Sequence, residues 1–351
     1  MNMADPVITA VVLTYRRPAM LRRAISSVLN QTFRDFRLCI YDDASGDETE
    51  QLVEEFRKKD ARVEYIRRPT RIGRAANFQD SGNRVETEFF SFLPDDDIML
   101  PEFFETALEG VRRYPQAALS VLPTLIMKPD GFVLGATALQ WPEGVVSPPQ
   151  GMLACLHYGN LGLPSVLIRR DVWREFAGFD DGTDPLTDLD FSLRVTSRLP
   201  VVVSRRPGGI QIIHPGSNTT LVEGSWFWPQ TRKMIQNLTE GTYLSPPVKN
   251  EVTAFLTRWM KRALVTQCIM RSIGQGRWDK AKDAADLLVE ASGRSRFAQA
   301  VCVATSACQK LPGVRMSVRA LLALRDGQKA LGNLKLQWRY RTYARNYLQA
   351  C

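Results

Sequence analysis

The chain has 351 residues, of which 44% are hydrophobic and 24% are charged, and its formal net charge is +9. This length exceeds that of a usual single domain and the composition excludes a disordered chain, so we expect one large core and a second unit. The charge is uneven: residues 225–351 carry 21 Lys+Arg and 7 Asp+Glu, whereas residues 1–224 carry 25 and 30. The basic character therefore belongs to the C-terminal third. It indicates an acidic partner surface there, either an anionic membrane or a polyanionic acceptor, rather than nucleic acid.

Cysteine spacing and apolar runs bear on the compartment. The six cysteines include no CxxC pair, which favours a reduced, cytoplasmic protein. We expect no secretory signal, because no charged and apolar leader precedes the first strand-like stretch. No apolar run approaches the ~20 residues that span a bilayer.

The first half of the chain alternates between strand-like and helix-like hydrophobic spacing. A helix is expected from Pro18 to about Asn30, and another after Asp47, with Gly73 leading a third. The expected strands are Val7–Thr14, Phe36–Tyr41, Val63–Ile66 and Glu88–Leu93. This alternation predicts parallel βαβ units.

Polar clusters follow three of these strands. They are Thr14-Tyr15-Arg16-Arg17, Asp42-Asp43 and Asp95-Asp96-Asp97. Ligands of open α/β sheets bind beyond the carboxyl ends of the strands. We therefore expect the three clusters to meet at one edge of the sheet.

Residues 116–224 have mixed patterns, and strand signals fade beyond about residue 225. Ala117–Met127 and Gly131–Leu134 are expected to form a hairpin. Further strands are expected at Leu163–Ile168, Val201–Val203 and Ile210–Ile213, and helices at Asp171–Phe176 and Thr187–Arg198. Amphipathic helices are expected at Val248–Ile273, Trp278–Ala291 and Val314–Leu331.

The acid run after the fourth strand is the strongest chemical signal. Three adjacent carboxylates are unfavourable unless a cation neutralises them, and Mg²⁺ or Mn²⁺ is commonly held by few carboxylates together with substrate phosphates. Such an ion stabilises a departing diphosphate. The alternative is a solvated acidic loop or a helix cap before Pro101.

Four motifs carry a family resemblance over roughly residues 6–215. They are Val11–Arg17, Ser26–Phe33, Asp42–Asp47 and Pro94–Asp97. In this order and spacing they resemble family 2 glycosyltransferases of the GT-A fold. The resemblance implies an inverting enzyme that uses a nucleotide diphosphate sugar and Mn²⁺ or Mg²⁺.

The resemblance also implies residue roles on the donor side. Asp43 matches the carboxylate that accepts the base N–H of a uracil-type nucleotide, and Tyr15 matches the aromatic that stacks on that base. The backbone of Leu13 and Thr14 lines the same pocket, and Arg17 follows in the same motif. Asp42 is then only a turn former, and Tyr15 could instead simply pack at a strand end.

On the metal side, Asp95 would lie near the ribose and Asp96 matches the metal ligand. Pro94 stands where many members have the first Asp, so Asp97 could share the metal. His214 matches a histidine that relatives often place near the metal or diphosphate. Arg71 and Arg74 flank Gly73, where relatives place basic groups near the diphosphate, although either could be an exposed helix charge.

Thr187-Asp188-Leu189-Asp190 resembles the element that carries the catalytic base. By position the base is Asp188, which must lie within reach of the attacking hydroxyl. Thr187 replaces the more usual Glu, so Thr187 or Asp188 could be a plain N-cap, and Asp190 is the rival base. The preceding Gly178–Asp181 resembles the acceptor-side loop.

The C-terminal third mixes aromatic and basic residues. Trp226-Phe227-Trp228 precedes Arg232-Lys233, and Leu334–Leu348 interleaves Trp338 and three tyrosines with Lys and Arg. This mixture suits an interfacial helix on anionic lipid. It equally suits a solvated basic face whose aromatics pack on the enzyme.

The sequence thus predicts an α/β GT-A domain over residues 1–224, Rossmann-like with a mostly parallel mixed sheet. Its nucleotide-binding half is about 1–115 and its acceptor half about 116–224, and a basic, mainly helical region follows over 225–351. The predicted reaction transfers a sugar to a hydroxyl of a saccharide or lipid-linked acceptor, in the cytoplasm or on the inner face of the membrane. The rival hypotheses are a nucleotidyltransferase and a non-catalytic sugar- or membrane-binding module. A nucleotidyltransferase would need a basic, Gly-rich triphosphate loop after the first strand, and Thr14–Pro18 contains no glycine.

Overall fold

A computed structural model of the chain describes residues 6–348 except 215, 218–223, 242, 294 and 312. The chain divides into two compact units. The first consists of the described residues up to Asp181, Thr187–Ser217, and the described residues from Arg339 onward. The second consists of Gly182–Leu186 and the described part of Asn218–Trp338. The domain boundary near residue 224 stays a prediction.

The first unit is built on an eight-stranded mixed sheet. In spatial order its strands are β3 (Val63–Arg67), β2 (Phe36–Asp42), β1 (Ile8–Thr14), β4 (Phe89–Pro94), β10 (Val166–Arg169), β6 (Leu119–Val121), β11 (Val201–Val203) and β9 (Gly144–Val146). From β3 to β4 every neighbour is parallel, whereas β10 runs antiparallel to both β4 and β6. The predicted mixed α/β sheet is confirmed.

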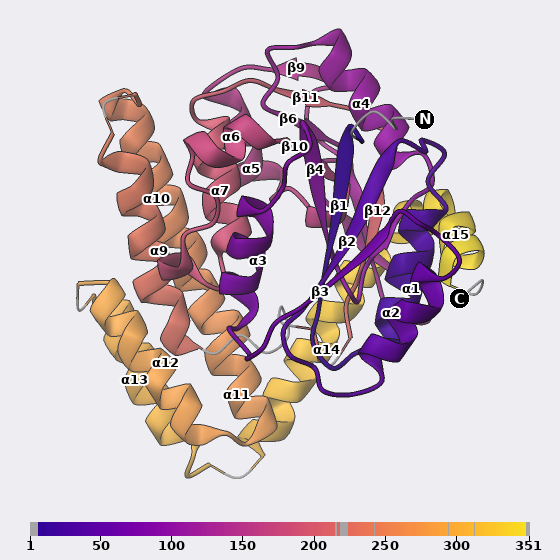
Figure 1. Cartoon of the computed structure of the whole chain (residues 1–351). Helices are drawn as coiled ribbons and strands as arrows, with labels where there is room; N and C mark the ends of the chain where they lie inside the picture. Colours follow the sequence, from indigo (N-terminus) through magenta and orange to yellow (C-terminus); the bar gives the residue numbers. More distant parts are fainter. Residues whose placement is uncertain are drawn as a thin grey trace. The chain divides into compact units, whose positions relative to one another are not determined.

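Helices cross between these strands and cover the sheet. They are α1 (Pro18–Leu29), α2 (Thr49–Arg57), α3 (Arg74–Asn83), α4 (Phe103–Arg113), α5 (Gln150–Tyr158), α6 (Arg170–Glu175) and α7 (Thr187–Thr196), with 3-10 turns at Leu163–Ser165 and Asp181–Thr183. In Figure 1, α1 and α2 lie on one side of β1, β2 and β3, and α3 lies on the other. The parallel strands β1, β2 and β3 thus have helices on both faces (Figure 1).

The core under α1 and α4 fixes these helices to the sheet. On α1 the buried residues Leu21, Ala24, Ile25 and Val28 recur at spacings of three and four, which places them on one face. Pro18 at the first turn suits the helix start, because its missing N–H has no partner there. Together with the buried faces of β1 and β2 these side chains form one apolar cluster.

A smaller second sheet corrects one prediction. Its order is β5 (Ile98–Met99), β12 (Gly209–Ile212), β7 (Thr124–Met127) and β8 (Val133–Ala136). The hairpin of β7 and β8 is as expected, but the single strand over Ala117–Met127 is wrong. The chain leaves the large sheet after β6 and enters the small one at β7. Pro123 lies between them and has no N–H for a ladder, while its carbonyl accepts the N–H of Gly208 at 2.9 Å.

The second unit is helical. Its elements are α9 (Gly224–Thr239), α10 (Pro246–Ala263), a π-helical turn (Leu264–Ile269), α11 (Met270–Gln275), α12 (Trp278–Ala291), α13 (Arg296–Cys308) and α14 (Val314–Gly332), and α15 (Leu334–Leu348) begins in this unit and continues into the first. The helices predicted at Trp278–Ala291 and Val314–Leu331 are confirmed by α12 and α14, whereas α13 was not predicted. The apolar core of the second unit includes Leu264, Ala284 and Leu288. Among the described residues, no helix is long and apolar enough to cross a membrane.

Candidate active site

The three polar clusters meet where β1, β2 and β4 end. In the strand register, Thr14 lies opposite Asp42, and Leu13 lies opposite both Tyr41 and Pro94. The three strands therefore end at the same level of the sheet. The Thr14 hydroxyl donates to Asp95 Oδ2 at 2.8 Å, and the N–H of Asp43 donates to the carbonyl of Thr14 at 3.0 Å. The parallel sheet thus brings together groups that lie about eighty residues apart in the sequence.

The turn after β1 is held by Ser45. Arg16 and Ala44 adopt left-handed φ values of 53° and 62°, which turn each chain sharply away from its strand. The N–H of Arg16 donates to Ser45 Oγ at 2.9 Å, and Arg16 Nε donates to the Ser45 carbonyl at 3.0 Å. The sequence pattern does not indicate this role of Ser45, because its partner Arg16 lies in another cluster.

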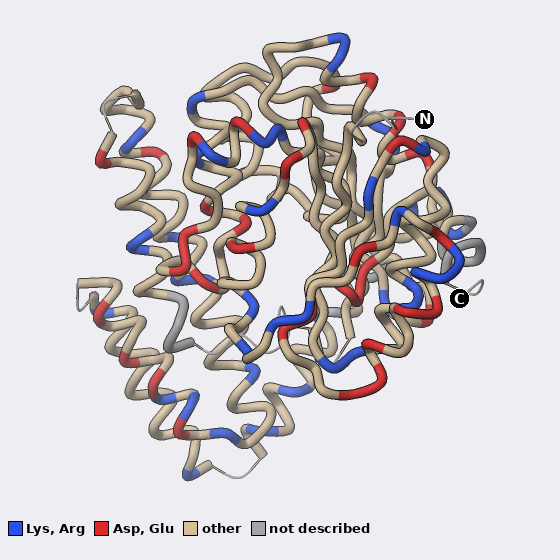
Figure 2. Tube along the Cα trace, viewed as in Figure 1, with Lys and Arg blue, Asp and Glu red and all other residues tan. Residues whose placement is uncertain are grey.

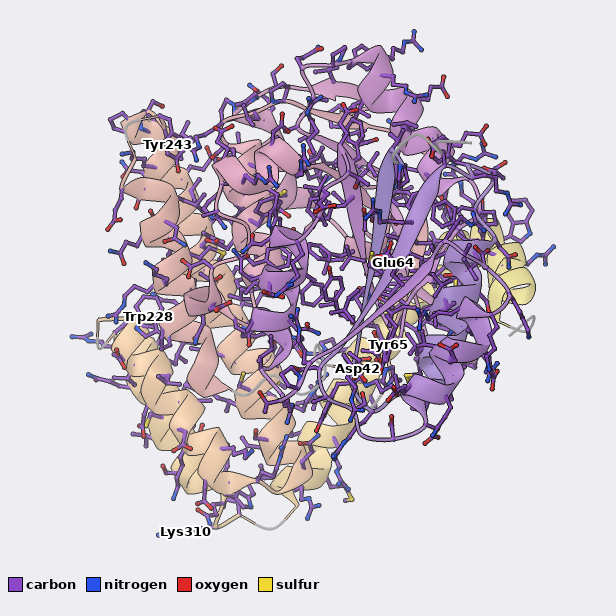
Figure 3. The ribbon with its side chains drawn as sticks, in the orientation of Figure 1. Asp42, Glu64, Tyr65, Trp228, Tyr243 and Lys310 are labelled. Carbon is purple, nitrogen blue, oxygen red and sulfur yellow. The ribbon has the colours of Figure 1, made fainter. Side chains whose placement is uncertain are left out.

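Asp42 is buried and shapes the second turn. Its Oδ1 accepts the N–H of Ser45 at 2.9 Å, and its Oδ2 accepts the Tyr65 hydroxyl at 2.6 Å. Figure 3 shows Asp42 and Tyr65 side by side. Burial, followed by the hydrogen bond to Asp42, raises the pKa of Tyr65 above its usual range. The fully hydrogen-bonded Asp42 carboxylate forms part of the turn.

Asp43 faces the loop that leads into α3. Its Oδ1 accepts the N–H of Ile72 at 2.7 Å and its Oδ2 accepts the N–H of Gly73 at 2.9 Å. Gly73 has a φ of 89°, a conformation that a side chain would strain. Each carboxylate oxygen has two lone pairs, so Asp43 keeps acceptor capacity beyond these two bonds.

Basic side chains gather around Tyr15. The Arg71 guanidinium lies 4.3 Å from the centroid of the Tyr15 ring, and the Arg16 guanidinium lies 5.2 Å from it. Arg71 Nε is 3.9 Å from Asp43 Oδ2. Arg74 begins α3 and lies 6.0 Å from the ring of Phe78. Tyr15, Arg71 and Asp43 therefore form one group, to which Arg74 is adjacent in sequence.

The acids of the run point in different directions. Asp95 is buried, and its Oδ2 accepts the Thr14 hydroxyl while its Oδ1 lies 3.3 Å from Arg17 Nη1. Burial, followed by the charge of Asp96, raises the pKa of Asp95 to about 6. Asp97 is also buried and its Oδ1 accepts the N–H of Ile212 at 2.9 Å, which ties the run to β12. Burial and then Asp96 raise the pKa of Asp97 well above its usual value.

Asp96 lies between Arg17 and His214. Its Oδ2 is 2.9 Å from Arg17 Nη1 and 3.2 Å from His214 Nε2. His214 Nδ1 accepts the N–H of Gly216 at 3.2 Å, so in the neutral imidazole the proton resides on Nε2 and points at Asp96. Arg17 Nη2 also donates to the carbonyl of Gly216 at 2.9 Å. Arg17 and Asp96 thus connect α1, the acid run and the segment after β12.

The motif that contains Gln31 holds the segment after the acids. Gln31 is fully buried; its Nε2 donates to the carbonyl of Leu100 at 2.7 Å and its Oε1 accepts the N–H of Phe104 at 3.0 Å. The N–H of Thr32 donates to the carbonyl of Pro101 at 2.8 Å. These bonds connect the end of α1 to the start of α4 and so position the acid run between them.

The two acids at the start of α7 differ in environment. Asp190 is fully buried, and its Oδ2 accepts Arg194 Nε at 2.7 Å. Arg194 also donates to the carbonyls of Phe176 and Gly178, which holds the loop before Asp180 and Asp181. Asp188 is only partly buried, and its Oδ1 accepts the N–H of Leu189 at 2.8 Å. Of the two carboxylates, Asp188 is the one that solvent reaches.

Among the described residues, no group of three or more His, Cys, Asp and Glu side chains is arranged to hold a metal ion. A cation at this edge would therefore depend on few protein ligands.

Comparison with known proteins identifies the N-terminal part of the chain. The family described as Glycosyl transferase family 2 matches residues 9–135. Residues 9–135 form a glycosyl transferase family 2 domain. This stretch contains the donor-side clusters at the ends of β1, β2 and β4, and it ends before α7.

The chain is also similar to a curated relative in sequence and to two solved structures in fold. GalNAc(5)-diNAcBac-PP-undecaprenol beta-1,3-glucosyltransferase of Campylobacter jejuni is 31% identical over 105 residues, which cover 30% of this chain and 34% of that protein. S. aureus TarS 1-349, solved with UDP-GlcNAc, matches with a TM-score of 0.65 at 15% sequence identity. The match covers 89% of this chain and 91% of the TarS chain. The mannosyltransferase PcManGT of Pyrobaculum calidifontis, solved with GDP-Man and Mn²⁺, matches with a TM-score of 0.53 at 14% sequence identity. The match covers 94% of this chain and 88% of the PcManGT chain.

These matches differ in what they cover. The aligned stretch spans about a third of the length of the C. jejuni relative. The structural matches extend over most of the chain but at low identity, so they show a shared fold, the GT-A arrangement with a helical C-terminal region.

Proposed function

We propose that the chain is an inverting glycosyltransferase that moves a sugar from a nucleotide diphosphate sugar, with a UDP-type donor favoured. The observation that carries the proposal is the meeting of Asp43, Asp95 and Asp96 at one sheet edge inside the family 2 domain. The crystal structure of TarS in complex with UDP-GlcNAc supports the donor class. The acceptor is a hydroxyl of a saccharide or lipid-linked saccharide, as the name of the C. jejuni relative suggests.

The donor base would be recognised by Asp43 and Tyr15. Asp43 accepts a base N–H with its remaining lone pairs, and Tyr15 offers its ring face where Arg71 now lies. Arg71 can stay near the nucleotide by turning its guanidinium toward the diphosphate, whose oxygens suit the guanidinium fork. The neighbouring Arg74 and the backbone of Leu13 and Thr14 complete this side, and Asp95 lies nearest the ribose.

The acids fit a divalent cation through Asp96. Within the described residues, Arg17 and His214 contact the Asp96 carboxylate through Oδ2, which leaves Oδ1 available for a hard cation. Asp96 would hold the ion, with His214 keeping the carboxylate oriented from its Nε2 side. A bound Mn²⁺ or Mg²⁺ supplies positive charge to the leaving diphosphate. The ligand contributions of His214 and Asp97 stay predictions, and in this structure Asp97 holds the N–H of Ile212.

Asp188 is the proposed base. Inversion requires a carboxylate that removes the proton of the acceptor hydroxyl as it attacks the anomeric carbon. Asp188 is partly exposed at the start of α7, whereas the Asp190 carboxylate is bound to Arg194 in the interior. Asp190 therefore acts as a positioning residue for the acceptor-side loop.

Ligand-dependent thermal stability tests the proposal. Melting temperatures are measured with UDP, GDP, CDP and their sugar conjugates, with and without Mn²⁺, because a ligand that binds the native state raises the melting temperature. A nucleotide-specific shift that grows with Mn²⁺ is expected. The absence of a shift with every nucleotide would favour the non-catalytic sugar- or membrane-binding module.

The base is tested separately with Asp188→Asn. This variant should keep the nucleotide-dependent shift and lose turnover by about 10²–10⁴-fold, the usual contribution of a general base. Asp171→Asn, which changes an exposed carboxyl on α6, is the matched control and should retain turnover. Normal turnover of Asp188→Asn would remove Asp188 as the base while leaving the donor site intact.

A further inference from the structure

The outer helices of the second unit expose apolar side chains. Among the described residues eleven large hydrophobic side chains are exposed, and eight of them lie between Phe297 and Trp338. They are Phe297, Val303, Leu311, Met316, Leu321, Leu324, Leu334 and Trp338. An apolar concentration of this kind on a soluble surface marks an interaction site.

On α13 the exposed apolar residues follow helical spacing. Ala298 and Thr305 are buried toward α12, and Val301 packs against the same core. On the other side, Phe297 and Val303 are 66% and 69% exposed, and alanines 300, 304 and 307 lie between Phe297 and Leu311 at spacings of three and four. The helix thus has one apolar face on the core and a second one that the described residues leave uncovered.

The next helix repeats this pattern. Val314 and Val318 of α14 pack against the core of the second unit. Met316 and Leu324 are 75% and 66% exposed, and they lie two turns apart on the opposite side of the helix. Two consecutive helices therefore present uncovered apolar side chains.

The charge of the segment that contains α13 and α14 indicates which kind of partner this surface binds. Residues 294–338 carry eight Lys+Arg and a single acid, Asp326. The preceding α12 carries four acids and two lysines within fourteen residues (Figure 2). A strongly positive apolar surface disfavours a second copy of itself, because like charges would meet when two such surfaces associate. Anionic phospholipid complements both properties, since acyl chains accept the apolar side chains and headgroups pair with Lys and Arg.

We propose that α13 and α14 dock the enzyme on an anionic phospholipid surface. Phe297, Met316 and Leu324 enter the acyl boundary, and long basic side chains such as Arg296 and Lys310 extend to the headgroup phosphates. Within α15, Trp338 is 74% exposed, whereas Tyr340 is buried. Of the aromatic cluster noted at Trp226-Phe227-Trp228, the first two side chains lie outside the part of the chain that the structure describes, and Trp228 packs against the core of the second unit. The proposal does not depend on the proposed sugar transfer.

Vesicle flotation with the full chain tests the proposal. Wild-type protein is mixed at 0.1 M NaCl with vesicles of phosphatidylcholine alone or with 30% phosphatidylglycerol, and the bound fraction is measured. Binding is expected only to the anionic vesicles, and 0.5 M NaCl should weaken it because salt screens the headgroup attraction. Failure to bind anionic vesicles, or equal binding to neutral ones, would overturn the proposal.

Two triple variants separate the apolar and the charged contribution. Phe297→Ser/Met316→Ser/Leu324→Ser and Arg296→Gln/Lys310→Gln/Lys335→Gln should each lower the vesicle partition coefficient by about tenfold or more. Tyr158→Ser and Lys58→Gln/Lys59→Gln change exposed residues of the first unit and should bind as wild type does. Unchanged binding of both triple variants contradicts the proposal. A second contradicting outcome is measured by light scattering. It is a wild-type dimer that becomes monomeric in the serine variant, with neither protein binding lipid.

Discussion

Arg17 Nη1 lies 2.9 Å from Asp96 Oδ2, and the same nitrogen lies 3.3 Å from Asp95 Oδ1. One guanidinium thus pairs with two neighbouring carboxylates at the sheet edge. A divalent cation bound to Asp96 would meet the positive charge of Arg17 at close range. Cation binding and the Arg17–Asp96 ion pair therefore oppose each other unless Arg17 turns toward a bound diphosphate.

Substitution of Arg17 should strengthen cation binding by the nucleotide-free protein. In Arg17→Gln the competing charge is gone, and a partly exposed ion pair contributes about 1 kcal/mol, which corresponds to roughly fivefold in affinity. Mn²⁺ binding is measured by titration calorimetry or from the resonance of free Mn²⁺.

Arg22→Gln is the matched control, because Arg22 lies on the same helix and pairs with the exposed Glu55. It should bind Mn²⁺ as the wild type does. Unchanged or weaker Mn²⁺ binding by Arg17→Gln would show that Arg17 does not compete with the cation.

The sequence predicts which polar clusters meet at the edge of the sheet, because this depends only on where each strand ends. Thr14, Asp43 and Asp95 each follow an apolar strand, and parallel strands place their carboxyl ends together. The sequence does not predict which oxygen contacts which partner. The bond between Arg17 and Asp96 depends on side-chain conformations that pattern and spacing leave undetermined.

Long-range polar contacts account for most of what was missed. Gln31 bonds to Leu100 and Phe104, about seventy residues away, and nothing near Gln31 in the sequence marks these partners. The break between β6 and β7 is of another kind. An apolar run through Pro123 has the composition of one strand, and only pairing with two different sheets divides it.

Ionisation of Asp95 should lower the free energy of unfolding as the pH rises toward neutrality. Its pKa is about 6 in the folded protein against 3.8 for the free group, so the folded state binds the proton more tightly. Between about pH 4 and pH 6 the folded state therefore holds more protons than the unfolded state, and stability declines with pH by up to about 3 kcal/mol. The unfavourable contribution is absent below this window and complete above it.

This contribution is measured as the difference in melting temperature between Asp95→Asn and wild type from pH 4.5 to pH 7.5. The asparagine variant does not ionise, so the difference should shift in its favour as the pH rises. Asp35→Asn alters an exposed carboxyl and should show no such trend. A constant difference across the pH range would contradict the raised pKa of Asp95.

Gln31→Leu should destabilise the first unit. The apolar side chain fills a similar volume but leaves the carbonyl of Leu100 and the N–H of Phe104 without the bonds they now make in the interior. Leaving two buried backbone groups unsatisfied costs about 2–4 kcal/mol. Urea unfolding measures the loss, and Gln51→Leu on the exposed side of α2 should change the unfolding free energy little. Equal stability of both variants would mean that the Gln31 bonds do not anchor the acid run.

Asp190→Ala should be more damaging to stability than any change at Asp188. The substitution leaves the Arg194 guanidinium in the interior without its carboxylate, and removing one partner of a buried ion pair costs about 3–5 kcal/mol. The exposed pair of Arg169 and Asp171 provides the control, since Asp171→Ala should cost less than about 1 kcal/mol.

The double variant Asp190→Ala/Arg194→Leu distinguishes a stranded charge from a lost loop contact. If the unpaired guanidinium causes the loss, removing it restores much of the free energy of unfolding measured in urea. If the carbonyl bonds of Arg194 to Phe176 and Gly178 dominate, the double variant is no more stable than Asp190→Ala. We expect recovery of stability together with low turnover, because the loop before Asp180 loses the side chain that holds it while Asp188 is unchanged.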